Sequence, residues 1–187
     1  MEETIESFMN KGNDLMQKAI DHLQYELIKI RTGKASVSIL DGIKVSYYGN
    51  PTLLSQMANV STPDSKTLSV QPWDKSVISA IEQAIFASNI GLTPMNDGET
   101  IRLSIPPLTE ERRVDLVKQA KHYGEEAKVS LRNIRHKILE FIKTEVKDGY
   151  PEDAGKRREE EVQKKVNEFA DQIDKIIDGK EKDIMAV

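Results

Sequence analysis

The amino-acid sequence predicts an α+β protein in which a long three-helix bundle contains a small β/α/β domain as an insertion. Two observations predict this class. Apolar residues recur every three or four positions in three long, highly charged stretches. Between the first and second stretches, the apolar residues of a middle segment alternate instead, as in half-buried strands. We therefore assign residues 1–30 and 106–187 to the bundle and residues 31–105 to the small domain.

The composition excludes several classes of protein. The 187 residues include 27 Lys and Arg against 31 Asp and Glu, a formal net charge of -4, and 38% are hydrophobic, which suits a folded protein. Because cysteine is absent, disulfides, thiol nucleophiles and Cys-ligated zinc are excluded, and we expect a cytoplasmic protein. The acidic first residues do not resemble a signal peptide, and no stretch approaches the roughly 20 apolar residues that span a bilayer.

Three apolar stripes predict the three helices. The second helix is expected to begin after Pro107, with Thr109 as a cap and two Glu in its first turn. An Asp-Gly-Tyr-Pro break at 148–151 separates it from the third helix. Burying the stripes together makes a bundle, and small residues allow close approach of the backbones. The predicted core positions are Ile5, Phe8, Gly12, Leu15, Ala19, Leu23, Leu27 and Ile30; Val117, Ala120, Gly124, Ala127, Leu131, Ile134, Ile138, Ile142 and Val146; and Val162, Val166, Phe169, Ile173 and Ile176.

The middle segment contains three predicted strands and a short helix. The strands lie in GIKVSYYG, KTLSVQP and TIRLSIP, which begin at residues 42, 66 and 100. The sequence Asn96-Asp97-Gly98 predicts a reversal before the last of them. Asp74 can cap a helix that contains Ile78, Ile81 and Ile85. We expect Trp73 to be buried beside a strand end; the alternative is an exposed stacking platform.

The chain passes between the two predicted bodies at two short crossings, so we predict an elbow there. Gly33 can adopt a backbone conformation that stops the first helix. The two prolines of the second crossing favour an extended backbone and donate no hydrogen bond. The predicted hinge residues are Arg31, Thr32, Gly33, Ile105, Pro106 and Pro107.

The sequence contains no familiar catalytic motif. A Gly-rich phosphate loop, a His-Glu-x-x-His pair and a Gly-x-Ser-x-Gly turn are all missing from it. His22, His122 and His136 have spacings that nominate no metal site. The pair Glu110-Glu111 is better explained by the positive end of a helix than by carboxylate catalysis. We therefore expect no enzyme activity, no cofactor and no bound metal.

A stripe of cations follows the core stripe of the second helix, displaced by one residue and so by about 100°. Glu125 interrupts it. One interpretation is a solvated face whose cations pair with acids of neighbouring helices. The other is a site for an RNA backbone, because a planar guanidinium donates two parallel hydrogen bonds to phosphate. An acidic protein suits local binding of this kind rather than indiscriminate binding. The stripe consists of Lys118, Lys121, Lys128, Arg132 and Arg135.

Four segments of the chain resemble the bacterial ribosome recycling factor family. They are IRTGKAS at 30–36, DGIKVSYYG at 41–49, PPLTEERR at 106–113 and GEEAKVSLRNIR at 124–135. The resemblance covers the whole chain and implies an L-shaped molecule with a flexible elbow. It also implies a factor that binds large-subunit ribosomal RNA after termination and, with the GTPase elongation factor G and GTP, splits the ribosome into subunits.

The resemblance also assigns roles to residues. Arg132 matches the family's main RNA-contacting arginine, and Arg31, Gly33 and the paired prolines match its elbow. The leading hypothesis is thus a non-enzymatic translation factor, expected to be a monomer that uses neither DNA nor membrane. A helical adaptor for acidic proteins and a hydrolase with an unrecognised site are the alternatives. The predicted RNA-binding residues are Arg132, Arg135, Lys128, Asn133, Lys121 and Lys118.

Overall fold

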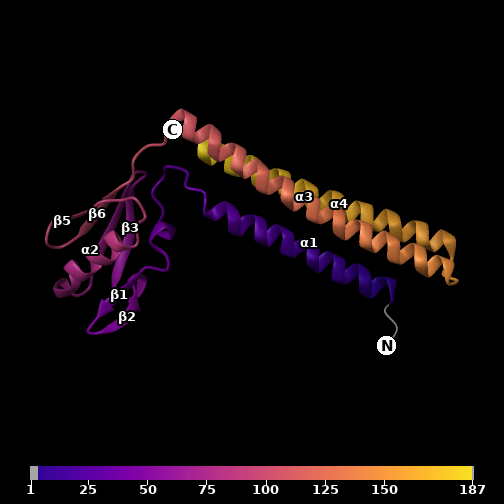
Figure 1. The fold of residues 1–187 in the computed structure, drawn as a ribbon, viewed down its shortest axis with the longest axis horizontal. Helices are drawn as coiled ribbons and strands as arrows, with labels where there is room; N and C mark the ends of the chain where they lie inside the picture. Colours follow the sequence, from indigo (N-terminus) through magenta and orange to yellow (C-terminus); the bar gives the residue numbers. More distant parts are fainter. Residues whose placement is uncertain (1–3, 187) are drawn as a thin grey trace. The chain divides into compact units, whose positions relative to one another are not determined.

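The computed structural model describes residues 4–186, which divide into two compact units. One unit contains the chain up to Thr32 together with the chain from Glu110 onward, and the other is Gly33–Thr109. The first is built from three long helices, and the second contains the strands and a short helix (Figure 1). The predicted α+β class, a helical bundle with a small inserted β-containing domain, is confirmed.

The bundle unit consists of α1 (Ile5–Ile28), α3 (Glu110–Lys147) and α4 (Glu152–Met185). Helices α3 and α4 run side by side in opposite directions, joined by the predicted break after Lys147 (Figure 1). Thr4 caps α1, since its hydroxyl accepts a hydrogen bond from the Ser7 N–H at 3.1 Å. The turn before α4 closes with a hydrogen bond from Tyr150 N–H to Glu145 C=O at 2.9 Å.

The core of the bundle follows the predicted stripes, with two shifts by one residue. Leu15, a predicted core position, is 49% exposed, whereas Met16 and Ile20 are buried. Ile177 is buried in α4 in place of Ile176, which is half-buried. The reason for the first shift is that α1 packs against both other helices, so the groove between them selects its inner face. Phe8 is half-buried and stacks on Phe141 with ring centroids 4.3 Å apart.

The small unit contains two antiparallel sheets. Strands β1 (Lys44–Tyr47) and β2 (Asn50–Leu53) form a hairpin, whose turn residues Tyr48 and Gly49 both have positive φ, at 47° and 84°. The second sheet has the order β3-β4-β6-β5. Its strands are β3 (Ala58–Asp64), β4 (Thr67–Pro72), β5 (Pro94–Asn96) and β6 (Ile101–Ser104). Helix α2 (Ile78–Ala87) lies between β4 and β5 in the sequence.

The central strands β4 and β6 and helix α2 contribute to the core of the small unit, together with Val45 of β1 and Leu54 after β2. In the β4–β6 pair, Leu68 lies opposite Leu103 and Val70 opposite Ile101, and all four side chains are fully buried. Asp74 caps the turn before α2, as predicted, by accepting from the Ser76 N–H at 2.9 Å. The expectation that Trp73 is buried is wrong, because its side chain is 70% exposed. The strand alternation explains this, since Leu68, Val70 and Pro72 take the inward positions.

Candidate nucleic-acid interface

The predicted cations lie on one continuous helix. Helix α3 has 38 residues, and its buried inner face includes Ala127, Leu131 and Ile138. The adjoining flank carries Lys118, Lys121, Lys128, Arg132 and Arg135, which we call the cationic ridge, with the exposed Asn133 beside it. Because the buried residues fix the rotation of α3, they also fix the direction in which the ridge faces.

Two lysines of the ridge form ion pairs with acids of α4. Lys128 Nζ lies 2.6 Å from Asp174 Oδ1, and Lys121 Nζ lies 3.8 Å from Glu181 Oε1. At Lys121 and Lys128, the ridge therefore fits the first interpretation, in which the cations pair with acids of a neighbouring helix. Partly exposed ion pairs of this kind contribute little to stability, so a phosphate can compete with the carboxylates for the lysines.

The two arginines have different partners. Arg132 donates from Nη2 to Glu125 Oε1 at 3.0 Å, and both side chains are about 60% exposed. Arg135 is half-buried and donates from Nε to the amide oxygen of Gln163 on α4 at 2.7 Å. Each guanidinium thus keeps further N–H donors for a ligand. Lys118 has no ion-pair partner within residues 4–186.

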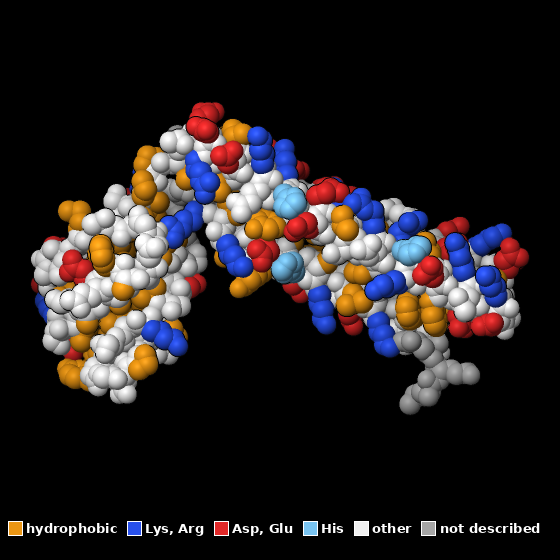
Figure 2. Space-filling view, in the orientation of Figure 1, with side chains coloured by type: hydrophobic (Ala, Val, Ile, Leu, Met, Phe, Trp, Pro, Cys, Tyr) orange, Lys and Arg blue, Asp and Glu red, His pale blue; other side chains and the backbone are white. Residues whose placement is uncertain are grey.

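Acids and cations are mixed elsewhere on the bundle, as Figure 2 shows for one of its faces. His122 lies 3.1 Å from Glu126 and His136 lies 3.2 Å from Glu140, both as exposed pairs one helical turn apart. In the described part of the chain, no group of three or more His, Asp or Glu side chains is arranged to hold a metal ion.

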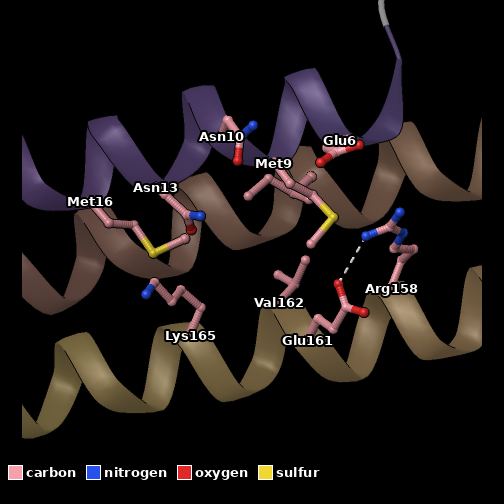
Figure 3. Close-up of a pocket in the computed structure, with 10 residues that line it drawn as sticks. Glu6, Met9, Asn10, Asn13, Met16, Arg158, Glu161, Val162 and Lys165 are labelled. Carbon is pink, nitrogen blue, oxygen red and sulfur yellow. Dashed lines mark hydrogen bonds and ion pairs between the residues drawn. The ribbon is translucent and has the colours of Figure 1, made fainter.

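A pocket of about 250 Å³ lies between α1 and α4 (Figure 3), and no residue of the ridge is among those that line it. Asn10, Asn13 and Met16 line its α1 side. On α4, Arg158 donates to Glu161 at 3.1 Å, and hydrogen bonds to Tyr150 and Glu161 raise the pKa of Arg158. The lining also contains Glu6, so two carboxylates stand against Arg158 and Lys165, and the pocket has no excess of positive charge for a phosphate.

The predicted hinge residues lie near the boundaries of the small unit. Gly33 has φ +76°, and a Cβ there would be 3.1 Å from Leu108 Cγ, so the two crossings lie side by side. Ile105 is buried and donates its N–H to Lys66 C=O at 2.8 Å, which ties it to the turn between β3 and β4. Pro106 and Pro107 are exposed, and the unit ends at Thr109.

The fold and the ridge together define a two-unit α+β protein with an exposed cationic flank that suits an anionic partner. No helix of residues 4–186 has both the length and the hydropathy needed to cross a membrane. A family model described as "Ribosome recycling factor" matches residues 23–185. The chain therefore belongs to the ribosome recycling factor family, and the predicted resemblance is confirmed.

Individual relatives match along almost the whole chain. A ribosome-recycling factor of Porphyromonas gingivalis is 50% identical over 184 residues, which is 98% of this chain and 99% of the relative. One from Desulforamulus reducens is 46% identical over 183 residues, 98% of this chain and all of the relative.

Two solved structures have the same fold. A solution structure of a ribosome recycling factor is 37% identical, covers both chains completely and gives a TM-score of 0.79. The T. thermophilus ribosome recycling factor, in a model with E. coli elongation factor G bound to the E. coli post-termination complex, is 41% identical with a TM-score of 0.64. That match covers 98% of this chain and 100% of the other.

Proposed function

We propose that this chain binds the ribosome after termination and, with elongation factor G and GTP, separates it into subunits that can start a new round of translation. The observation that carries the proposal is the identity of 46–50% to ribosome-recycling factors over 98% of the chain. A solved relative has been placed with elongation factor G on a post-termination complex, which supports the same partners here.

The cationic ridge is the proposed contact with large-subunit ribosomal RNA. Arg132 is its central residue, because its guanidinium is well exposed and, within residues 4–186, is paired with a single carboxylate. Arg135, Lys128, Lys121, Lys118 and Asn133 extend the contact along α3. Arginine suits this role, since its planar group can donate two hydrogen bonds to one phosphate while an exposed ion pair is readily exchanged.

In this proposal the chain supplies binding and mechanical coupling rather than catalysis. The long bundle is the part held by RNA, and the free energy for splitting comes from the GTP of elongation factor G. The small unit receives that movement through the crossings at Arg31, Thr32 and Gly33 and at Pro106 and Pro107. The protein would act as a monomer in the cytoplasm, where ribosomes translate, without a cofactor, DNA or membrane.

A splitting assay tests the function directly. The purified protein is mixed with post-termination ribosomes, elongation factor G and GTP, and light scattering follows the separation of subunits. We expect scattering to fall only when all four components are present. Unchanged scattering in the complete mixture would disprove the function.

The role of Arg132 needs a separate binding measurement. Arg132→Ala should weaken binding to purified large subunits by roughly tenfold, the value of one charge-assisted hydrogen bond. Arg157→Ala is the matched control, because Arg157 is exposed on α4 and has no partner within the described residues. Equal affinities of the two variants would remove Arg132 from the interface.

A further inference from the structure

The α4 residues that face the cationic ridge change in charge along the helix. At one end the partners are carboxylates, and each of them balances a lysine of α3. At the other end the partner is a neutral amide. In order along the ridge, the pairs are Lys121 with Glu181, Lys128 with Asp174 and Arg135 with Gln163.

We propose that Gln163 is a positioning residue for Arg135: its side-chain amide holds the guanidinium in one orientation and leaves the positive charge available for a phosphate of ribosomal RNA. This inference rests on the proposed function, because it concerns the same ridge. It adds a residue of α4 to an interface otherwise assigned to α3.

The orientation of the amide is set by a second hydrogen bond. Gln163 Nε2 donates to Asn167 Oδ1 at 2.9 Å, so the carbonyl end of the amide is the one directed at Arg135. It accepts from Arg135 Nε at 2.7 Å. The reverse orientation would point two N–H groups at a cation. Two neutral side chains on successive turns of α4 therefore hold the arginine.

The bond to Gln163 uses the inner nitrogen of the guanidinium. The two outer nitrogens, Nη1 and Nη2, make no hydrogen bond within residues 4–186. Those nitrogens can donate in parallel to two oxygens of one phosphate. The next residue of the same row of α4 is Glu159, and no ion pair links it to Arg135. Arg135 is half-buried, and the bond to Gln163 limits its rotamers, so less entropy is lost when a ligand binds.

A carboxylate in place of the amide would change the charge but preserve the geometry. Gln163→Glu has nearly the same shape, yet it would form an ion pair with Arg135 like those of Lys121 and Lys128. Gln172→Glu is the matched control, because Gln172 is exposed on α4, roughly half a turn around the helix axis from Gln163. Both variants alter the net charge equally.

The affinity for purified large ribosomal subunits is measured for each protein at several KCl concentrations. We expect Gln163→Glu to bind roughly threefold to tenfold more weakly than the wild type at low salt. The slope of log affinity against log salt should fall in magnitude by up to about 1, because the added carboxylate competes with the phosphate for Arg135 and weakens that contact. Gln172→Glu should match the wild type in both quantities. Equal behaviour of the two glutamate variants would overturn the proposal.

A variant without the acceptor isolates the positioning effect. Gln163→Leu keeps the charge of Arg135 available but releases its orientation. We expect weaker binding with an unchanged salt slope, since the number of phosphate contacts stays the same. Wild-type affinity of Gln163→Leu would show that Arg135 needs no positioning, which contradicts the inference.

A double-mutant cycle distinguishes positioning from general repulsion of RNA by the added acid. In an Arg135→Ala background, Gln163→Glu should have no further effect, because the group that it acts through is absent. An equal loss in both backgrounds would mean that the carboxylate acts on the RNA directly and would overturn the role of Gln163. Far-UV circular dichroism confirms that each variant is folded.

The binding titrations and the splitting assay together distinguish a failure of this inference from a failure of the proposed function. If the wild-type protein fails to bind large subunits, or fails to split ribosomes with elongation factor G, the recycling function itself is wrong. If the wild type does both, and Gln163→Glu is indistinguishable from Gln172→Glu, only the role of Gln163 is lost.

Discussion

Single glycines determine how closely the helices of the bundle approach each other. A Cβ added at Gly124 of α3 would lie 2.7 Å from Cγ1 of Ile177 on α4. A Cβ added at Gly155 of α4 would lie 2.6 Å from Cγ2 of Val146 on α3. Non-bonded carbon atoms prefer separations of about 3.5–4.0 Å. At these positions any side chain would therefore force the helices apart or distort the neighbouring residue.

This contact predicts opposite effects for two glycine substitutions. Gly124→Ala should destabilise the bundle, because overpacking costs about 1–3 kcal/mol and the helix propensity of alanine recovers at most about 1 kcal/mol. Gly179→Ala, in the same bundle, meets no atom within 4 Å and should be stabilising through helix propensity alone. Thermal unfolding followed by circular dichroism at 222 nm, about the helix minimum, tests this. A rise in Tm for Gly124→Ala would contradict the packing argument.

At the scale of single residues, the sequence predicts whether a side chain is buried better than it predicts which residues that side chain contacts. Apolar spacing predicts most of the core, yet it favours Leu15 where Met16 is buried, because both residues fit a helical stripe and only the partner helices decide between them. The bond from Arg135 to Gln163 could not be foreseen. Nothing in the spacing of α3 indicates which flank of α4 lies opposite it.

At the scale of elements, aspartates stabilise three turns of the small unit. Asp64 accepts from the Lys66 N–H at 2.8 Å, Asp74 from the Ser76 N–H at 2.9 Å and Asp97 from the Thr100 N–H at 2.7 Å. Hydrogen bonds to the ionised form favour it. They lower the pKa of Asp64 through the Lys66 N–H, of Asp74 through the hydroxyl and N–H of Ser76, and of Asp97 through the N–H groups of Glu99 and Thr100.

These lowered pKa values predict acid sensitivity of the small unit. In the unfolded chain each aspartate regains its ordinary pKa of 3.8, so the unfolded state binds protons at a higher pH than the folded state does. The stabilisation is thus fully present above that pKa and is lost as pH falls through the lower folded value. Trp73, the single tryptophan of the chain, reports on the small unit in urea unfolding at each pH.

Asp97→Asn tests the linkage, because an amide can still accept the two N–H bonds but cannot titrate. We expect its unfolding free energy to fall less steeply than that of the wild type between about pH 5 and pH 2. Asp41→Asn is the matched control, because Asp41 is exposed in the same unit and its side chain makes no hydrogen bond within the described residues. Identical pH profiles for Asp97→Asn and the wild type would exclude Asp97 as a source of the acid sensitivity.

The predictability of an element depended on how much of it is buried. The three long helices and the central strands β4 and β6 show clear apolar periods, and all were predicted. The strands β3 and β5, at the edges of their sheet, and β2 of the hairpin were not. Strand β2 contains Pro51, and β5 has three residues and begins with Pro94. Edge strands bury few side chains, so they lack the alternation that marks a central strand.

At the scale of the whole molecule, the chain consists of two units that each have a core of their own. The small unit buries its own apolar cluster, and the bundle buries the three helical stripes. The family was predictable from four short segments, since they cover both units and both crossings. The use of the crossings as a hinge stays a prediction. It follows from the narrow connections, after Thr32 and after Thr109, and from the exposed prolines before the second.

A reversible lock between the two units tests the hinge. The chain has no cysteine, so a pair introduced with one member in each unit would form a unique disulfide. If splitting requires the small unit to move while the bundle stays on RNA, the oxidised protein should bind large subunits normally but split post-termination ribosomes more slowly. Reduction with dithiothreitol should restore the rate in the same sample, which controls for the substitutions themselves. Full splitting activity of the oxidised form, across several such pairs, would show that the crossings transmit force without bending.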